Sequence, residues 1–264
     1  MGVLNINSDS FFKGSRVTDE TALMHRVEQM IVDGVTVIDV GGMSSRPGAT
    51  IISASEEMAR ISPAVKAIRT TFPNQVISID TVWGDVADWA IDQGVHMIND
   101  ISAWEVDPRL LEVVGAHNVP YILMHMQGLP NSMQKNPVYD DVVLTVLDFL
   151  IEKVGRLLDA GVFDVIVDPG FGFGKSVDDN YKLLQNLHVL KILDRPILVG
   201  MSRKSMIQKV LEVDGEQALN GTTALHMIAL QQGAQILRTH DVKEAVQCVK
   251  LWQKLQENGT PPAG

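Results

Sequence analysis

The chain has 264 residues, of which 45% are hydrophobic and 20% are charged, a composition typical of a soluble globular protein. Its formal net charge of −10 argues against nucleic acid as a partner, because non-specific binding needs a basic face, but a few converging cations could still hold a small anion. Cys248 is the only cysteine, so an intramolecular disulfide and a cysteine metal cluster are both excluded.

Eight short apolar runs, each ending on or beside a polar or glycine residue, predict the strands. They are residues 3–5, 37–39, 77–80, 97–99, 122–125, 166–168, 197–200 and 236–238. Short runs of this kind are typical of parallel strands buried on both faces. Because helical stretches separate them, the pattern predicts an α/β fold, the (β/α)8 TIM barrel, with its active site at the carboxyl ends of the strands. We expect one domain over 1–257 and a disordered tail over 258–264.

Helices are expected between these strands. Thr18 and Asp19 are candidate caps of the first helix, and Ser53 or Ser55 is the candidate start of the second, in which Pro63 indicates a kink or a first turn. Further helices are predicted near 83–93, 107–117, 140–160, 178–190, 203–212, 216–232 and 241–256. Two of them lie between the seventh and eighth strands, so one is additional. The glycines predicted to end helices in a left-handed conformation are Gly94, Gly115, Gly161 and Gly233.

Three long loops rich in Gly, Ser and Asp follow strands one, two and six, at 7–14, 44–48 and 169–175. Loops of this kind on a rigid scaffold commonly hold ligands. The third loop misses the phosphate-loop pattern by one residue, because Pro169 stands where the first glycine is required. We interpret it as a close backbone approach to a ligand, with Phe171 or Phe173 available for stacking. A surface turn is the alternative.

Polar residues at strand ends are the candidates for binding chemistry. Asp80, Asn99 and Asp168 end three strands, and buried carboxylates there need donors. Two acids and an amide suit the edge of a planar, guanidine-like heterocycle that offers adjacent N–H groups. Neutralisation by helix N-termini or lysines is the structural alternative. His125 is interpreted as a packed or hydrogen-bonded histidine and not a metal ligand, and the adjacent Met124 as pocket wall or core.

Cations follow the last two strands. Arg203 and Lys204 open a helix whose dipole they oppose, which indicates a bound anion or electron-rich ring. Arg238 and His240 also open a helix, in the region where barrels of this class hold phosphate. A solvated Arg–His pair is the alternative reading. Asn5 offers an amide oxygen that suits Mg²⁺ held mainly by substrate phosphates and water.

No apolar stretch approaches the length of a membrane span, and no signal peptide is evident, so we expect a cytoplasmic protein with no membrane partner. A buried Cys248 fits that reducing location. The first predicted strand begins at residue 2, an abrupt start that is consistent with a missing short leading segment.

In chain order, these motifs resemble the dihydropteroate synthase family. The resemblance runs through nearly the whole chain and is carried by GVLNINSDSF from Gly2, IDVGG from Ile38, SRPG from Ser45, SIDT from Ser78, INDI from Ile98, LMHMQG from Leu123, DPGFGFGK from Asp168, GMSRKS from Gly200 and RTHDV from Arg238. It implies a homodimeric, pterin-binding TIM barrel of folate biosynthesis and a target of sulfonamides. The implied enzyme is a transferase that joins p-aminobenzoate to 6-hydroxymethyl-7,8-dihydropterin pyrophosphate, with Mg²⁺ as cofactor.

The resemblance also implies roles for single residues. Asp168, Lys204 and Asp9 would be catalytic, Asp9 lying in a first loop that closes over the substrates. The pterin would contact Asp80, Asn99, Met124, Asp168, Phe173 and Lys204. The pyrophosphate would contact Asn5, Arg238 and His240, with Asn5 also on the metal. The p-aminobenzoate and sulfonamide subsite would be Ser45, Arg46, Pro47, Phe173, Lys204 and Ser205.

The chain departs from the family pattern in places. Asn7-Ser8-Asp9 stands where Thr-Pro-Asp is usual, Met43 where Glu is usual, Ser44-Ser45-Arg46 where Ser-Thr-Arg is usual, and Ala103 where Arg is common. These changes bear on loop closure and p-aminobenzoate affinity. Two alternatives therefore stay open: a paralogue that binds pterin without turnover, and a methyltetrahydrofolate-type methyltransferase domain on the same barrel.

Overall fold

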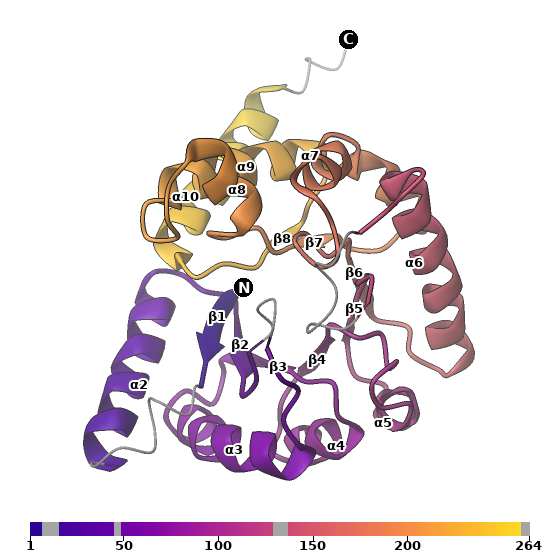
Figure 1. Ribbon diagram of the computed structural model, residues 1–264. Coiled ribbons are helices and arrows are strands. Elements are labelled where there is room, and N and C mark those ends of the chain that lie inside the picture. Colours follow the sequence, from indigo (N-terminus) through magenta and orange to yellow (C-terminus); the bar gives the residue numbers. More distant parts are fainter. Residues whose placement is uncertain (7–15, 45–48, 129–136, 260–264) are drawn as a thin grey trace.

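Eight parallel strands lie around the centre of the molecule and the helices lie outside them, as Figure 1 shows for this computed structural model. The structure describes residues 1–6, 16–44, 49–128 and 137–259. The strands are β1 Gly2–Asn5, β2 Val37–Gly41, β3 Val76–Asp80, β4 Met97–Asp100, β5 Tyr121–Met124, β6 Val165–Asp168, β7 Leu198–Val199 and β8 Ile236–Leu237. This order confirms the predicted TIM barrel.

The strands pair in sequence order. β1 to β6 form one parallel sheet, and β7 and β8 form a second one. Single parallel bridges join the two sheets, Val167 to Ile197 on one side and Gly2 to Thr239 on the other. Because all strands are parallel, their carboxyl ends face the same rim, where the polar residues that end the strands gather.

The helices alternate with the strands as predicted. They are α2 Arg16–Val32, α3 Ala54–Thr71, α4 Gly84–Asp92, α5 Arg109–His117, α6 Val142–Asp159, α7 Val177–Gln185, the 3₁₀ helix η1 Leu187–Leu193, α8 Ser205–Leu211, α9 Leu219–Gln232 and α10 Val242–Gly259. The predicted additional helix between β7 and β8 is present, since α8 and α9 both lie there. None of the helices in the described ranges is long and apolar enough to cross a membrane.

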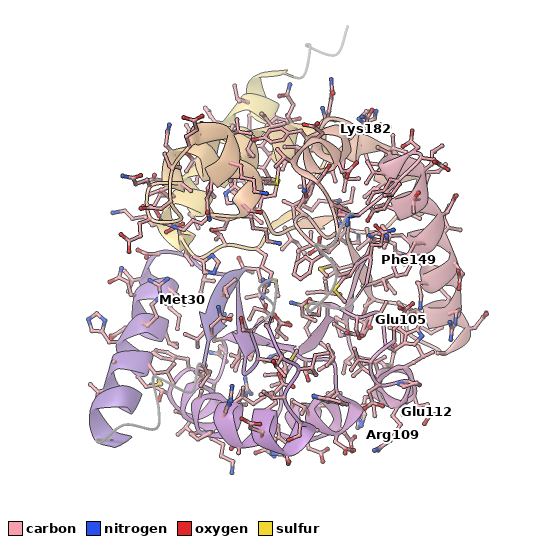
Figure 2. The ribbon with its side chains drawn as sticks, in the orientation of Figure 1. Met30, Glu105, Arg109, Glu112, Phe149 and Lys182 are labelled. Carbon is pink, nitrogen blue, oxygen red and sulfur yellow. The ribbon has the colours of Figure 1, made fainter. Side chains whose placement is uncertain are left out.

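The helices cover the strands with an apolar layer. Met30 on the inner side of α2 is 1% exposed, whereas Arg109 on α5 and Lys182 on α7 lie at the outer rim (Figure 2). Strand β5 is buried along its whole length, as a strand covered on both faces must be. Cys248 is buried, as expected.

Several helix boundaries differ from the prediction. Helix α2 begins at Arg16, so Thr18 lies inside it and does not cap it. Ser53, one of the two candidates, caps α3 by accepting the Glu56 N–H, and Pro63 lies in the interior of that helix, not in its first turn.

The glycine stop signals hold with one exception. Gly94, Gly161 and Gly233 adopt positive φ, but Gly115 lies inside α5, which ends at Asn118 in a left-handed conformation. A Cβ on Gly115 would lie 2.5 Å from the Ala160 carbonyl oxygen, so this glycine permits close packing of α5 on the end of α6. Of the expected tail, residues 258–259 belong to α10 and 260–264 lie outside the described residues.

Candidate active site

Arg238, directly after β8, is the centre of a buried charge network. Its Nε donates to Asp39 Oδ2 and its Nη2 donates to Asp80 Oδ2, both at 2.7 Å. Asn99 Nδ2 donates to the same Asp39 oxygen at 3.1 Å. Asp39, Asp80 and Asn99 lie on β2, β3 and β4 and are all buried. Side chains from three neighbouring strands and from the end of the last strand are therefore joined in one network.

Burial and charge act in opposite directions on the protonation of this network. Burial raises the pKa of Asp80 to about 7, although the Arg238 guanidinium opposes the shift. Burial also lowers the pKa of Arg238, but the charges of Asp39 and Asp80 outweigh it, and the net shift is upward. Arg238 therefore stays charged, and Asp80 is a group that titrates in the neutral range.

Lys204 lies beside this network, at the N-cap of α8. Its Nζ donates to the Phe171 carbonyl at 2.5 Å and lies 4.4 Å from the centroid of the Phe173 ring. A Cβ built on Gly200 would be 3.9 Å from both Lys204 Nζ and Arg238 Cβ. The absence of a side chain at Gly200 therefore leaves open a space that both cations border.

Asp168, which ends β6, is the acid whose charge acts most strongly on Lys204. Its Oδ1 accepts the Gly170 N–H at 2.7 Å, and its side chain is buried. Burial raises the pKa of Asp168, and the nearby Lys204 ammonium opposes that shift. Burial lowers the pKa of Lys204 to about 8, and Asp168 opposes it. Each group therefore favours the charged form of the other, as in a buried acid–base pair.

The glycine loop after β6 packs on the end of β5. Gly170, Gly172 and Gly174 all have positive φ. A Cβ on Gly170 would lie 1.9 Å from the His125 carbonyl oxygen, and one on Gly174 would lie 2.4 Å from the Gln127 carbonyl oxygen. The close backbone approach that the structure shows is to the segment after β5, and the expected approach to a ligand stays a prediction. Of the two candidate stacking rings, Phe171 is buried in the main core and Phe173 is the one beneath Lys204.

A small apolar cluster adjoins these polar groups and is separate from the main core. Its buried members follow or end β2 to β6 and are Met43, Val82, Ile101, Met124 and Phe173. Met124 is thus part of a buried apolar cluster, and its role as a pocket wall stays a prediction. An apolar surface beside fixed polar groups is the usual construction of a small-molecule site.

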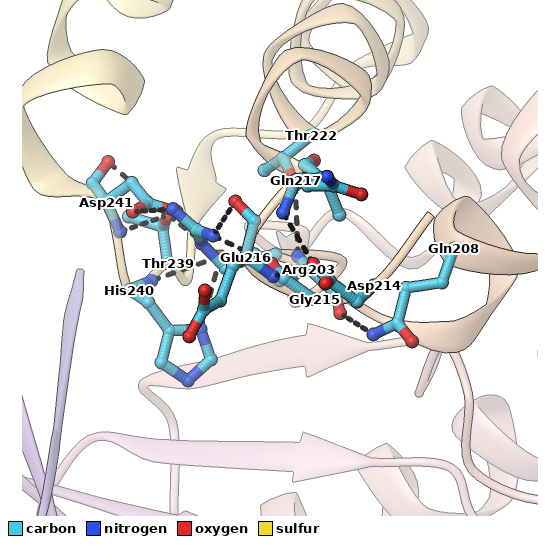
Figure 3. A network of polar contacts seen from close by, with 12 residues as sticks. Arg203, Gln208, Asp214, Gly215, Glu216, Gln217, Thr222, Thr239, His240 and Asp241 are labelled. Atoms are coloured by element: carbon cyan, nitrogen blue, oxygen red, sulfur yellow. Dashed lines mark hydrogen bonds and ion pairs between the residues drawn. The ribbon is translucent and has the colours of Figure 1, made fainter. Parts of the chain in front are cut away.

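Arg203 does not border the site, contrary to the expectation that both cations of the β7–α8 loop attract a ligand. It makes two hydrogen bonds to Asp241, at 2.8 and 2.9 Å, and two to the carbonyls of Gly215 and Glu216 (Figure 3). The Asp241 carboxylate balances the charge of Arg203, and these bonds connect the start of α8 to the start of α10. Only Lys204 of the pair is directed to the strand ends.

His240 and Ser205 lie at the exposed edge of the site. His240 Nδ1 lies 3.2 Å from Ser202 Oγ, and desolvation together with the charge of Arg238 lowers the pKa of the imidazole. Ser205 is the first residue of α8, next to Lys204. Asp9, Ser45, Arg46 and Pro47 lie outside the described residues, so their predicted roles stay predictions.

Asn5 ends β1 with its side chain exposed. A Cβ on Gly41 would lie 3.6 Å from Asn5 Oδ1 and 3.4 Å from Asp80 Cβ, so only a glycine separates the two side chains. Within the described ranges, no group of three or more His, Cys, Asp or Glu residues could hold a metal by itself. One exposed amide oxygen does fit a Mg²⁺ ion that takes most of its ligands from phosphate and water.

Asp39 is the principal site residue that sequence reasoning did not assign. It is fully buried and accepts from both Arg238 and Asn99. The signal was a carboxylate within a short buried strand, before two glycines, which is the argument already used for Asp80. His125 makes a hydrogen bond to Lys175 and packs on Phe149, which confirms the structural interpretation of that histidine.

Comparison with known proteins agrees with this arrangement. A family profile described as "Pterin binding enzyme" matches residues 1–240. Dihydropteroate synthase of Haemophilus influenzae is 43% identical over 255 residues, which cover 96% of this chain and 92% of the relative. This chain belongs to the dihydropteroate synthase family. Enzymes of the family are transferases of folate biosynthesis.

Solved structures of the dihydropteroate synthase family superpose closely on the chain. The Yersinia pestis enzyme in complex with a sulfonamide drug has a TM-score of 0.91 and 39% identity, covering 97% of this chain and 94% of that one. The Xanthomonas albilineans enzyme with 4-aminobenzoic acid has a TM-score of 0.90 and 37% identity, covering 99% and 93%. The TIM-barrel fold of this chain is therefore that of dihydropteroate synthases.

Proposed function

We propose that the protein condenses p-aminobenzoate with 6-hydroxymethyl-7,8-dihydropterin pyrophosphate to give 7,8-dihydropteroate and pyrophosphate. The observation that carries the proposal is the convergence of Asp80, Asn99, Asp168, Lys204 and Arg238 on one rim, where acids, an amide and cations meet an apolar wall.

The buried acids and the amide suit the pterin ring. Asp80 and Asp168 offer carboxylate oxygens and Asn99 an amide to the adjacent N–H groups and ring acceptors of the heterocycle. Met124 and Phe173 of the apolar cluster would cover its faces. Lys204 would donate to the pterin from the side.

The cations suit the leaving group and the second substrate. Arg238, with His240 and Asn5 at the exposed edge, would contact the pyrophosphate. Asn5 would also contact Mg²⁺, which when bound would offset the negative charge of the departing pyrophosphate. Lys204, Ser205 and Phe173 would form the described part of the p-aminobenzoate subsite, where sulfonamides would compete.

The reaction breaks the bond between the pterin methylene carbon and the pyrophosphate oxygen and forms a bond from that carbon to the amine nitrogen of p-aminobenzoate. The amine is already neutral near pH 7, so no strong base is needed before attack, and the proton it carries afterwards is released. Positive charge develops on the pterin while pyrophosphate departs. Fixed carboxylates at the ring and cations at the leaving group favour that separation, so we infer that departure precedes attack.

Pyrophosphate release from the pterin substrate, with and without p-aminobenzoate, tests the proposal. The wild-type protein should form dihydropteroate, and Asp168→Ala and Lys204→Ala should each remove most turnover while the fold is retained. Pterin binding without turnover would instead identify a silent paralogue. A near-normal rate in either variant would refute the assigned roles. Release that occurs only when p-aminobenzoate is present would exclude the early departure.

We further propose a cytoplasmic homodimer that uses the face formed by α9 and α10. These helices pack on each other and expose Ile228, Leu251 and Leu255, the last two one helical turn apart. Light scattering on the purified protein should give twice the mass of the chain, and Leu251→Glu should shift it to monomer. A wild-type monomer would contradict the proposal.

A further inference from the structure

Lys175 is a buried cation that the proposed chemistry does not use. It ends the glycine loop, just before α7, and is 2% exposed. Its Nζ lies 2.9 Å from His125 Nδ1, 2.9 Å from the Gly170 carbonyl oxygen and 3.2 Å from the Phe173 carbonyl oxygen. In the described part of the chain it forms no salt bridge with a carboxylate. An ammonium buried without a counter-ion is costly, so these three acceptors and the more distant His125 carbonyl oxygen, at 3.5 Å, must offset that cost.

The three short partners match an ammonium with three N–H donors. A protonated ammonium has no lone pair and can only donate, so His125 Nδ1 must accept when Lys175 is charged, which places the imidazole proton on Nε2. Burial and the charge of Lys175 lower the pKa of His125 to about 3, so the ring stays neutral. Burial also lowers the pKa of Lys175, to about 7. His125 is in turn fixed by the edge of the Phe149 ring, 4.9 Å away between centroids, which α6 directs inward (Figure 2).

The two carbonyl groups that Lys175 holds are on either side of the segment that contacts Lys204. Gly170 precedes and Phe173 follows the pair Phe171–Gly172, and the Phe171 carbonyl accepts from Lys204 Nζ. A Cβ on Gly172 would lie 3.2 Å from Lys204 Cδ, so the lysine stem passes close beside the loop at this glycine. A shift of this loop would therefore move the contacts of Lys204 directly.

We propose that Lys175 is a positioning residue of the reaction, which together with His125 fixes the glycine loop so that the Phe171 carbonyl and the Phe173 ring hold Lys204 at the site. This inference rests on the proposed function, which assigns Lys204 and Phe173 to both substrates. The pterin would keep Asp80, Asn99 and Met124, which lie on β3, β4 and β5, whereas Lys204 and Phe173 are two of the three described residues of the p-aminobenzoate subsite. Loss of Lys175 should therefore affect p-aminobenzoate more than pterin.

The test uses Lys175→Met, which keeps the length of the side chain and removes its donors, with Lys182→Met as the matched control, since Lys182 is an exposed lysine of the adjacent helix α7. We expect Lys175→Met to raise KM for p-aminobenzoate about tenfold or more and to lower kcat, while Kd of the pterin substrate, measured alone by calorimetry, changes less than about threefold. Lys182→Met should leave all three values unchanged.

A second pair of variants tests the acceptor at His125. Asparagine can present an oxygen where Nδ1 stood, so His125→Asn should retain KM close to the wild-type value, whereas His125→Leu should reproduce the effect of Lys175→Met. If Lys175→Met fails to fold, the two His125 variants still test the inference. Unchanged KM for p-aminobenzoate, equal losses in pterin and p-aminobenzoate affinity, or equal effects of His125→Asn and His125→Leu would each overturn the inference. An inactive wild-type protein would instead refute the proposed function.

Discussion

Arg238 and Asp80 are 158 positions apart in the sequence and form a 2.7 Å ion pair at the rim of the barrel. The same guanidinium also binds Asp39, so one cation holds two buried carboxylates that would otherwise repel each other. Arg238 therefore compensates part of the negative charge of these two acids. A pterin that brings N–H donors to Asp80 would partly release Arg238 toward the pyrophosphate.

Replacing Arg238 by methionine should destabilise the fold as well as abolish activity. The variant leaves Asp39 and Asp80 buried without their shared partner, and breaking a buried pair in this way costs about 3–5 kcal/mol. The free energy of unfolding from urea titration at pH 7.5 measures this cost. Arg109→Met is the control, because Arg109 pairs with Asp85 on the exposed surface, where solvent screens the ion pair and its loss should cost little. Equal losses in the two variants would contradict the prediction.

Affinity for the pterin substrate should fall as the pH is lowered through about 7. The pKa of Asp80 is raised to about 7 in the free protein, chiefly by burial, and donors on the pterin favour its ionised form. Protonation of Asp80 at lower pH therefore competes with binding, and the Kd of the pterin substrate should rise by up to about tenfold per pH unit below the pKa. Calorimetric titration from pH 5.5 to 8 measures the slope. Asp80→Asn should bind more weakly and lose this dependence, and a wild-type Kd that stays constant over that range would refute it.

Glu57 on α3 should reduce stability at neutral pH. It is fully buried, one carboxyl oxygen accepts from Thr81 Oγ1 at 2.6 Å, and the other has no hydrogen-bond partner in the described residues. Burial raises its pKa from 4.5 to about 7, so between these values the folded state holds a proton that the unfolded chain lacks. Its contribution to the free energy of unfolding therefore decreases as pH rises through that window.

Glu57→Gln removes this titration and keeps an acceptor for Thr81. The difference in stability between variant and wild type should grow from pH 5 to pH 8 in favour of the variant, to about 1–3 kcal/mol, since each pKa unit corresponds to about 1.4 kcal/mol. Urea unfolding at the two pH values measures it. A difference that does not change with pH would show that Glu57 does not titrate there.

Gly170→Ala should damage the site, whereas Gly155→Ala should not. Gly170 has a φ of +70°, and an added Cβ would lie 1.9 Å from the His125 carbonyl oxygen, so the loop after β6 must move. We expect a loss of about 2–4 kcal/mol together with a higher KM for p-aminobenzoate. Gly155 lies inside α6 with nothing within 4 Å of the added atom, so alanine there should stabilise by about 0.5–1 kcal/mol. Thermal unfolding and steady-state kinetics of both variants measure these effects, and equal stability and KM in the two variants would contradict the prediction.

The barrel and much of its rim could be predicted from sequence, because short apolar runs with a polar end report strands that are buried on both faces. Asp80, Asn99 and Asp168 were identified by their positions alone, at the ends of such runs. Asp39 also ends its predicted run, 37–39, but it was not assigned, because its importance comes from partners on β4 and after β8, which only the folded chain brings near. Arg203 shows the converse, since its partner Asp241 lies 38 positions away and removes it from the site.

Helix limits were harder to predict where local signals compete with packing. Gly115 resembles a stop signal, but the reason for that glycine is the nearby Ala160 carbonyl on another helix. The sequence could not tell which of Phe171 and Phe173 faces the site. One ring points into the main core and the other toward Lys204 only because of the conformation of the glycines between and around them. The network of Lys175 and His125 likewise depends on a contact between residues 50 positions apart.

Four groups at the rim, Asp39, Asn99, Asp168 and Arg238, come from β2, β4, β6 and β8 or the position just after them. A chain divided between β4 and β5 would thus leave two of these groups in each fragment, and neither fragment could form the pocket by itself. Separately expressed halves should regain pterin binding only upon reassociation, which would make the ligand a direct reporter of barrel complementation.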